Sequence, residues 1–163
     1  MSVQINYKNN INKKNSSNVV FFIDEKFDIS LIKKHILGSE YSFISDLLKI
    51  SDLKNEILSF NINSKKKIIL VSLKKNQKNV DIENLGAKFY EKFKLIKQSN
   101  YILNSDYIPS KLKNVVGHFL HGLMLKSYKF EKYKTKKIKN NFNIIITGKN
   151  KPSLRDQIKF KAI

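Results

Sequence analysis

The stretch that decides the fold is LHGLMLKSYKFEKYKTKK, residues 120–137, followed closely by FNIIIT, residues 142–147. Apolar residues recur at helical spacing ahead of the first stretch and within it, which predicts a long helix from about Pro109 onward. Tyr128, Phe130 and Tyr133 continue its apolar face while lysines crowd its end, where cations complement the partial negative charge of a helix C-terminus. The β-branched run at 142–147 predicts a buried strand after a lysine-rich turn.

The same periodicities continue on the N-terminal side. Strands are predicted at residues 4–7, 18–23, 56–62, 67–73 and 101–103, with 63–66 joining two of them as a hairpin. The run VVFFI within 18–23 is typical of a strand covered on both faces. Helices are predicted at 29–37, ending at Gly38, and at about 41–49, with Phe43, Leu47 and Ile50 on its apolar face. A further helix begins at Asp81, and its apolar stripe is formed by Ile82, Leu85, Phe89, Phe93 and Ile96.

Strands that alternate with helices of this length indicate an α/β fold, in which a mixed sheet is flanked by helices. The chain has 163 residues, which suits one domain with a hydrophobic core. It contains no cysteine, no apolar leader and no run long enough to span a membrane, so we expect a cytoplasmic protein without disulfides.

One segment of the chain resembles a known family. The pattern Y-x-F-x-x-Y-K-T-K resembles the end of the N-terminal domain of the leucyl aminopeptidase (cytosol aminopeptidase) family; it is formed by Tyr128, Phe130, Tyr133, Lys134, Thr135 and Lys136, preceded by Gly122, Leu123 and Leu125. EILSFNI (56–62) and KIILVSLKKNQ (67–77) are similar to the paired strands that precede the family's first long helix. The resemblance implies a macro-domain-like three-layer sandwich.

The resemblance also implies a domain division. Residues 1–150 match the family's N-terminal domain, and residues 151–163 match the start of the helix that leads to a catalytic domain. Pro152 favours a helix start, and Leu154, Ile158 and Ala162 follow at steps of four. This stripe reaches Ile163 without a capping residue, so we expect a missing catalytic domain to follow.

The whole enzymes of this family release N-terminal amino acids from peptides with two divalent metal ions, zinc or manganese, and assemble as hexamers. Their catalytic signature, N-T-D-A-E-G-R, has no counterpart in this sequence, so no catalytic, cofactor-binding or metal residue is assigned. The resemblance therefore implies a non-catalytic domain that assists assembly and active-site access and is inactive alone.

The net charge of +19 supports an alternative hypothesis, a basic nucleic-acid-binding module. Residues 1–60 carry eight basic against seven acidic side chains, 61–124 carry twelve against four, and 125–163 carry twelve against two, so the charge lies in the C-terminal half. However, Arg155 is the sole arginine, and base reading favours the arginine fork. We favour a solvated lysine surface, with DNA binding as the alternative.

Few side chains form a pattern that indicates chemistry. His118 and His121 are spaced to share a metal, but the acid closest to His118 in sequence is Asp106, twelve residues before it and outside the predicted helix. We therefore favour ordinary helix residues, one exposed and one against a neighbouring helix. Asp24, Glu25 and Asp28 follow a predicted strand, and helix capping together with solvent exposure is the preferred interpretation. His35 is given no role. The five glycines form no phosphate-binding motif, which argues against a stand-alone enzyme that binds ADP-ribose as macro domains do.

Overall fold

The structure is a computed structural model that describes residues 3–8, 18–94, 100–109, 111–132, 142–150 and 152. Six strands form one sheet: β1 (Val3–Tyr7), β2 (Asn18–Asp24), β3 (Ile57–Asn61), β4 (Lys67–Leu73), β5 (Asn100–Asn104) and β6 (Phe142–Thr147). Their order is β1-β6-β5-β2-β4-β3, and every pairing is parallel except that of β3 with β4. Each predicted strand is present, and 63–66 turns the hairpin as predicted.

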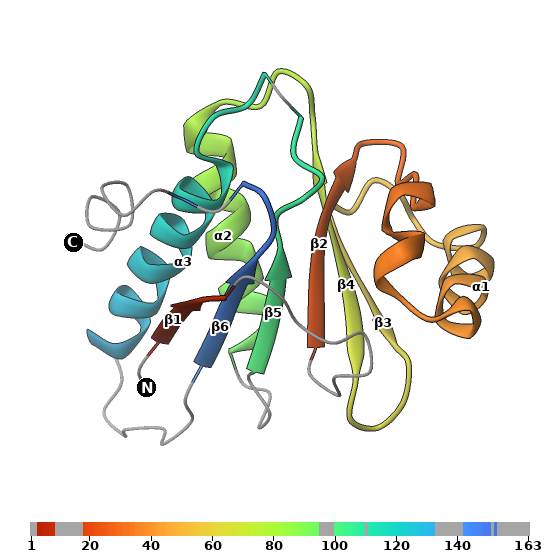
Figure 1. Cartoon of the computed structure of the whole chain (residues 1–163). Helices are drawn as coiled ribbons and strands as arrows, with labels where there is room; N and C mark the ends of the chain where they lie inside the picture. The colour runs from red at the N-terminus through yellow and green to blue at the C-terminus, as the bar shows by residue number, and fades with distance from the viewer. Residues whose placement is uncertain are drawn as a thin grey trace.

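Helices cover both faces of this sheet (Figure 1). One face carries α2 (Asn79–Phe93) and α3 (Val115–Lys132), and the other carries the short 3₁₀ helix η1 (Ser30–His35) and α1 (Gly38–Leu48). Strand β2 supplies both cores, with Val20 and Phe22 on the α2 and α3 side and Phe21 and Ile23 on the other. The predicted mixed sheet flanked by helices in three layers is therefore confirmed.

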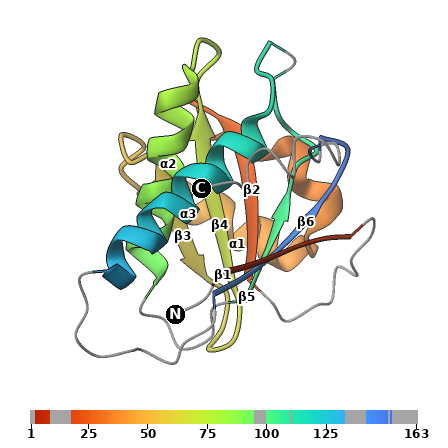
Figure 2. The same ribbon diagram turned by 90° about the vertical axis from the view of Figure 1, so that its left-hand side faces the viewer.

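The larger core lies between the sheet and the α2–α3 pair, which Figure 2 shows side by side in front of the strands. Its centre is Phe89 of α2, which is fully buried. The Phe89 ring packs against rings from three other elements, with centroids 5.3 Å from Tyr101, 5.5 Å from Phe119 and 6.1 Å from Phe142. Tilted and edge-on contacts of this kind are the favoured geometry for aromatic rings.

Two glycines let α2 and α3 approach until their backbones touch. A Cβ atom placed on Gly86 of α2 would lie 1.9 Å from the carbonyl oxygen of Phe119. A Cβ atom on Gly122 of α3 would lie 1.8 Å from the carbonyl oxygen of Glu83. Since each glycine faces the backbone of the other helix, neither position has room for a side chain. The crossing is therefore specified by a reciprocal pair of glycines.

The opposite layer is tied to the sheet by a buried ion pair. Lys66, in the β3–β4 turn, places its Nζ atom 2.9 Å from Oε2 of Glu40 in α1, and the side chains are only 8% and 6% exposed. The other carboxylate oxygen of Glu40 accepts a hydrogen bond from the backbone N–H of Leu37, at 2.9 Å. Glu40 thus closes the first turn of α1 and also anchors the helix to the β3–β4 turn.

The helices on this side differ from the prediction. The helix predicted at 29–37 is only a 3₁₀ turn over Ser30–His35, because Ile36 and Leu37 adopt extended conformations. Gly38 does not end a helix but begins α1. Ile44 is buried, whereas Phe43 is 43% and Ile50 82% exposed, so the predicted apolar face Phe43–Leu47–Ile50 is largely wrong.

The long helix also starts later than predicted. Pro109 forms a turn, in which its carbonyl oxygen accepts a hydrogen bond from the N–H of Leu112 at 3.0 Å. Asn114 then takes a left-handed conformation, with φ of 56°, and α3 begins at Val115. Asparagine tolerates this conformation better than most residues, and it interrupts the helical path from Pro109.

Several predictions fall on parts of the chain that the structure does not describe. They are Ile96, the pattern residues Tyr133 to Lys136, and the helix expected within 151–163, of which Pro152 alone is described. The division into 1–150 and 151–163 therefore stays a prediction. Among the described helices, none is both long and apolar enough to cross a membrane.

Alanine at either crossing glycine is expected to destabilise the protein. Gly86→Ala and Gly122→Ala each force a methyl group into a facing carbonyl, and overpacking of this kind costs about 1–3 kcal/mol or more. The measurement is the free energy of unfolding from urea titration. Gly38→Ala is the matched control, because nothing lies within 4 Å of its Cβ position. If Gly86→Ala matched that control in stability, the glycine crossing would be wrong.

Removing one partner of the buried pair is expected to cost more than removing both. Lys66→Met leaves the Glu40 carboxylate buried without a counter-charge, a loss of about 3–5 kcal/mol. Glu40→Gln combined with Lys66→Met keeps an acceptor for the Leu37 N–H, so we expect much of the stability to return. Lys49→Met, in an exposed pair with Asp46 at 3.9 Å, is expected to change little. A double variant less stable than Lys66→Met would contradict this account.

Candidate functional site

The sheet has a topological switch point between β2 and β5. The connection after β2 passes to the η1 and α1 face, and the connection after β5 passes to α3 on the opposite face. In open α/β sheets, ligands bind outside the carboxyl ends of the strands at such a point. The side chains that follow β2, β4 and β5 are therefore the first place to look for a site.

The acidic residues after β2 build the turn that leads into η1. Oδ1 of Asp24 accepts hydrogen bonds from the backbone N–H groups of Lys26 and Asp28, at 3.2 and 3.0 Å. Oδ1 of Asp28 accepts one from the N–H of Ser30, at 3.0 Å, and this bond lowers the pKa of the Asp28 carboxyl below its ordinary value. Two of the three acids thus bind backbone in the turn that precedes η1. The N-cap of η1 is Ile29, which makes no side-chain capping bond, so neither acid is the predicted helix cap.

His35 lies at this switch point, although no pattern in the sequence assigned it a role. Its Nε2 atom is 2.7 Å from the hydroxyl of Tyr107 and 3.3 Å from Oδ2 of Asp106. Asp106 and Tyr107 follow β5, whereas His35 ends η1, so the contact joins two loops at the carboxyl end of the sheet. The separation of 72 residues between His35 and Tyr107 explains why no local pattern revealed it.

Polar atoms of Ser105 and Asp106, in the loop after β5, form hydrogen bonds with the backbone at the end of β6 and in the loop after it. Oδ1 of Asp106 accepts the N–H of Lys149 at 2.8 Å, and the buried hydroxyl of Ser105 donates to the carbonyl of Thr147 at 2.5 Å. Gly148, with φ of 99°, passes so close that a Cβ atom would lie 2.7 Å from Oγ of Ser105. These contacts fasten the loop after β6 to the loop after β5. We therefore assign Asp106 and Ser105 structural roles.

His118 and His121 meet an acid that the sequence did not indicate. Oε1 of Glu83 in α2 lies 3.4 Å from Nδ1 of His118 and 3.3 Å from Nδ1 of His121. Asp106, the acid closest in sequence to His118, contacts His35 instead. Both histidines are half-buried against α2, so the expectation that one is exposed is wrong. No group of three or more His, Cys, Asp or Glu among the described residues has a geometry that could hold a metal ion.

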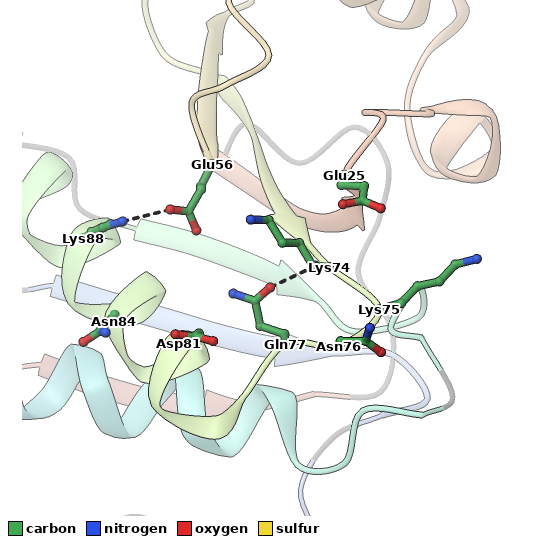
Figure 3. A pocket seen from close by; sticks show the side chains of 9 residues that line it. All are labelled: Glu25, Glu56, Lys74, Lys75, Asn76, Gln77, Asp81, Asn84 and Lys88. Carbon is green, nitrogen blue, oxygen red and sulfur yellow. Dashed lines mark hydrogen bonds and ion pairs between the residues drawn. The ribbon is translucent and has the colours of Figure 1, made fainter.

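A polar groove opens at the carboxyl end of the sheet, where β4 ends and α2 begins (Figure 3). Its volume is about 480 Å³, and it is lined by Glu25, Glu56, Lys74, Lys75, Asn76, Gln77, Asp81, Asn84 and Lys88. Figure 3 shows Lys88 paired with Glu56, at 2.9 Å, and Gln77 accepting the N–H of Lys74, at 3.0 Å. The lining therefore carries three lysines and three acids.

The start of α2, at one side of the groove, is already occupied by its own chain. Oδ2 of Asp81 accepts the backbone N–H of Lys78 at 3.2 Å, which closes the first turn of the helix. None of the five glycines lines the groove, so it lacks the glycine-rich loop that lets a backbone approach a pyrophosphate. Its lining also contains no serine, cysteine or histidine that would serve as a nucleophile with a base. The groove suits polar and ionic contacts with a ligand.

Comparison with known proteins finds likeness in structure but not in sequence. No protein-family model matches the chain, and no curated protein matches it in sequence. A mutant of tomato leucine aminopeptidase superposes on it with a TM-score of 0.65 and 15% identity, covering 98% of this chain and 35% of that one. The macrodomain of Thermus aquaticus DarG superposes with a TM-score of 0.56 and 7% identity, covering 93% of this chain and 100% of that one.

These likenesses show the fold. The predicted macro-domain-like three-layer sandwich is confirmed, and the chain spans about a third of the aminopeptidase that it matches. The expected resemblance to the aminopeptidases therefore holds for the structure, whereas the sequence comparisons give it no support.

The acidic turn after β2 is expected to contribute a pH-dependent part of the stability. Because the pKa of Asp28 is lowered by folding, its contribution is full above the ordinary value of 3.8 and is lost as the pH falls through the lower folded value. Urea midpoints of the wild type and Asp28→Asn should therefore differ slightly at neutral pH and converge in acid. Glu25→Gln removes the same charge from the same turn, so it separates this effect from net charge. An Asp28→Asn difference that persisted in acid would refute it.

Proposed function

We propose that this chain is the non-catalytic, N-terminal type of domain found in leucyl aminopeptidases. The observation that carries the proposal is the superposition of 98% of the chain on part of a leucine aminopeptidase that is about three times as long. A domain that matches so completely and yet covers 35% of its neighbour is best understood as one module of such a protein. The Y-x-F-x-x-Y-K-T-K pattern supports the same assignment from the sequence.

The side chains at the carboxyl end of the sheet support a non-catalytic role. The acids there bind backbone N–H groups or lysines, as Asp28, Asp81 and Glu56 do. Hydrolysis by two metal ions needs several carboxylates that converge on one point, and the described residues offer no such group. In this proposal the two divalent ions, zinc or manganese, belong to a catalytic domain outside this chain.

The domain would then act on a peptidase through its surfaces. We propose that it assists the assembly of the oligomer, a hexamer in this family, and limits access of peptides to the active sites. The parent enzyme would release N-terminal amino acids from peptides. Binding of DNA by the lysine-rich C-terminal half stays a prediction, as does a cytoplasmic location.

The test is hydrolysis of leucine p-nitroanilide by the purified chain with added manganese or zinc. We expect no turnover above that of the metal in buffer, because the described residues include no group of carboxylates that converge on a metal. A full-length leucyl aminopeptidase in the same buffer is the positive control. Metal-dependent turnover that co-purifies with the chain and disappears with a chelator would overturn the proposal.

Calorimetry with ADP-ribose separates this proposal from the alternative of a stand-alone macro-like enzyme. The fold favours that alternative, since the chain covers a complete macrodomain, whereas the glycine-free groove argues against it. We expect no heat of binding. Saturable binding of one ADP-ribose per chain would favour the macro-like alternative.

A further inference from the structure

Strand β3 forms one edge of the sheet, and half of its backbone groups point away from the sheet. The carbonyl of Glu56 accepts the N–H of Ser72 at 2.8 Å, and the N–H of Ile62 donates to the carbonyl of Lys66 at 3.0 Å. In an antiparallel pair, such bonded residues alternate with residues whose N–H and C=O groups face outward. Ile57, Ser59 and Asn61 therefore direct their backbone groups to the open edge.

This edge has little internal cover in the described part of the chain. Its one backbone contact there is made by Lys92 of α2, whose Nζ atom donates to the carbonyl of Ile57 at 3.2 Å. Ser59 is half-buried and Asn61 is exposed, so water reaches both. The outward groups of Ser59 and Asn61 are thus available to a further strand.

Two lysines without an acidic partner stand beside this edge. The Nζ atoms of Lys67 and Lys92 lie 5.9 and 5.8 Å from the ring centroid of Phe93, on which both rest. Neither forms an ion pair with a described carboxylate, although Lys88 and Lys94 nearby do. Burial lowers the pKa of Lys92, and the positive charge of Lys67 lowers it further. An added carboxylate would relieve this repulsion.

The positive charge continues to the start of the strand. A groove of about 360 Å³ lies there, lined by Lys54, Asn55, Glu56, Ile57, Lys88 and Lys92. It contains three lysines and one acid, and that acid is already paired with Lys88. Cations therefore flank β3 at both ends, with Lys67 opposite Asn61 at the far end.

We propose that the outer edge of β3 is a docking surface for an extended, acidic segment of a partner protein, which adds to the sheet as a further strand. Its backbone would pair with Ser59 and Asn61, and its carboxylates would lie against Lys67 and Lys92. Main-chain hydrogen bonds give such strand addition its affinity, and side chains give its specificity. This surface adjoins the carboxyl-end groove, with which its flanking groove shares Glu56 and Lys88. The strand pairing with Ser59 and Asn61 does not depend on the proposed aminopeptidase module.

Lysines also occur on edge strands for another reason, since they discourage edge-to-edge aggregation. That function needs charge alone, whereas docking needs both the lysines and the outward N–H groups. The two explanations therefore differ in their dependence on the backbone of Ser59, which can be changed without touching the β3–β4 pairing.

The probe is a fluorescein-labelled peptide of alternating valine and glutamate, titrated with the protein at low ionic strength and followed by anisotropy. Ser59→Pro removes the outward N–H, and proline is tolerated where an edge N–H faces solvent. We expect saturable binding that weakens at least about tenfold in Ser59→Pro. Ser59→Val, which keeps the N–H, should bind like the wild type.

The charge requirement is tested with Lys67→Gln combined with Lys92→Gln, which should weaken binding by a similar factor. The matched control is Lys26→Gln combined with Lys111→Gln, two exposed lysines outside this edge, which should bind normally. Hydrogen exchange of the wild type needs no variant, and the peptide should slow exchange at Ser59 and Asn61.

Three results would overturn the proposal. They are the absence of peptide binding, equal binding by Ser59→Pro and Ser59→Val, and unchanged exchange at Ser59 and Asn61 at saturation. A single-stranded DNA of equal charge, tested in parallel, should not compete. Competition by DNA together with insensitivity to Ser59→Pro would indicate an anion-binding surface in place of strand docking.

Discussion

The close contact between α2 and α3 is the constraint on which the rest of the fold depends. With Gly86 against Phe119 and Gly122 against Glu83, the two helices lie near enough together to cover one face of the sheet as a single layer. The approach that brings Gly122 to the backbone of Glu83 also brings His118 and His121 to its carboxylate. The histidine–glutamate contact is therefore best understood as a product of helix packing.

Local sequence patterns predicted well where helices and strands lie. They predicted less well which side chains are buried by contacts between distant segments. The strand at 67–73 has the predicted bounds, because a β-branched run specifies a strand from its own composition. The predicted apolar face of α1 was wrong because the orientation of this helix depends on Lys66. That lysine lies far from α1 in the sequence and holds Glu40 in a buried ion pair. Similarly, Glu83 is 35 residues from His118, so no spacing rule pairs them. Tertiary contacts of this kind are not visible in periodicity.

The carboxyl end of the sheet shows why position in a fold does not by itself give function. The topology places Asp24, Asp106 and His35 where related architectures bind ligands, yet each of them contacts neighbouring loops. The five glycines match no phosphate-binding motif in the sequence, and the structure shows what three of them do. Gly86 and Gly122 serve the helix crossing, and Gly148 serves the contact with Ser105. The same residue types therefore hold this domain together without forming a cradle.

The pairing of β1 with β6 has a consequence for how the protein is made. Val3 to Tyr7 lie beside Phe142 to Ile146, so β1 meets its partner strand only after β6 has left the ribosome. Contacts between such distant segments slow folding, because loop closure must precede them. During synthesis, the isolated strand exposes unpaired backbone and apolar side chains to solvent and to other nascent chains. Until β6 is made, β1 is therefore an unpaired strand that is exposed to wrong pairing and aggregation.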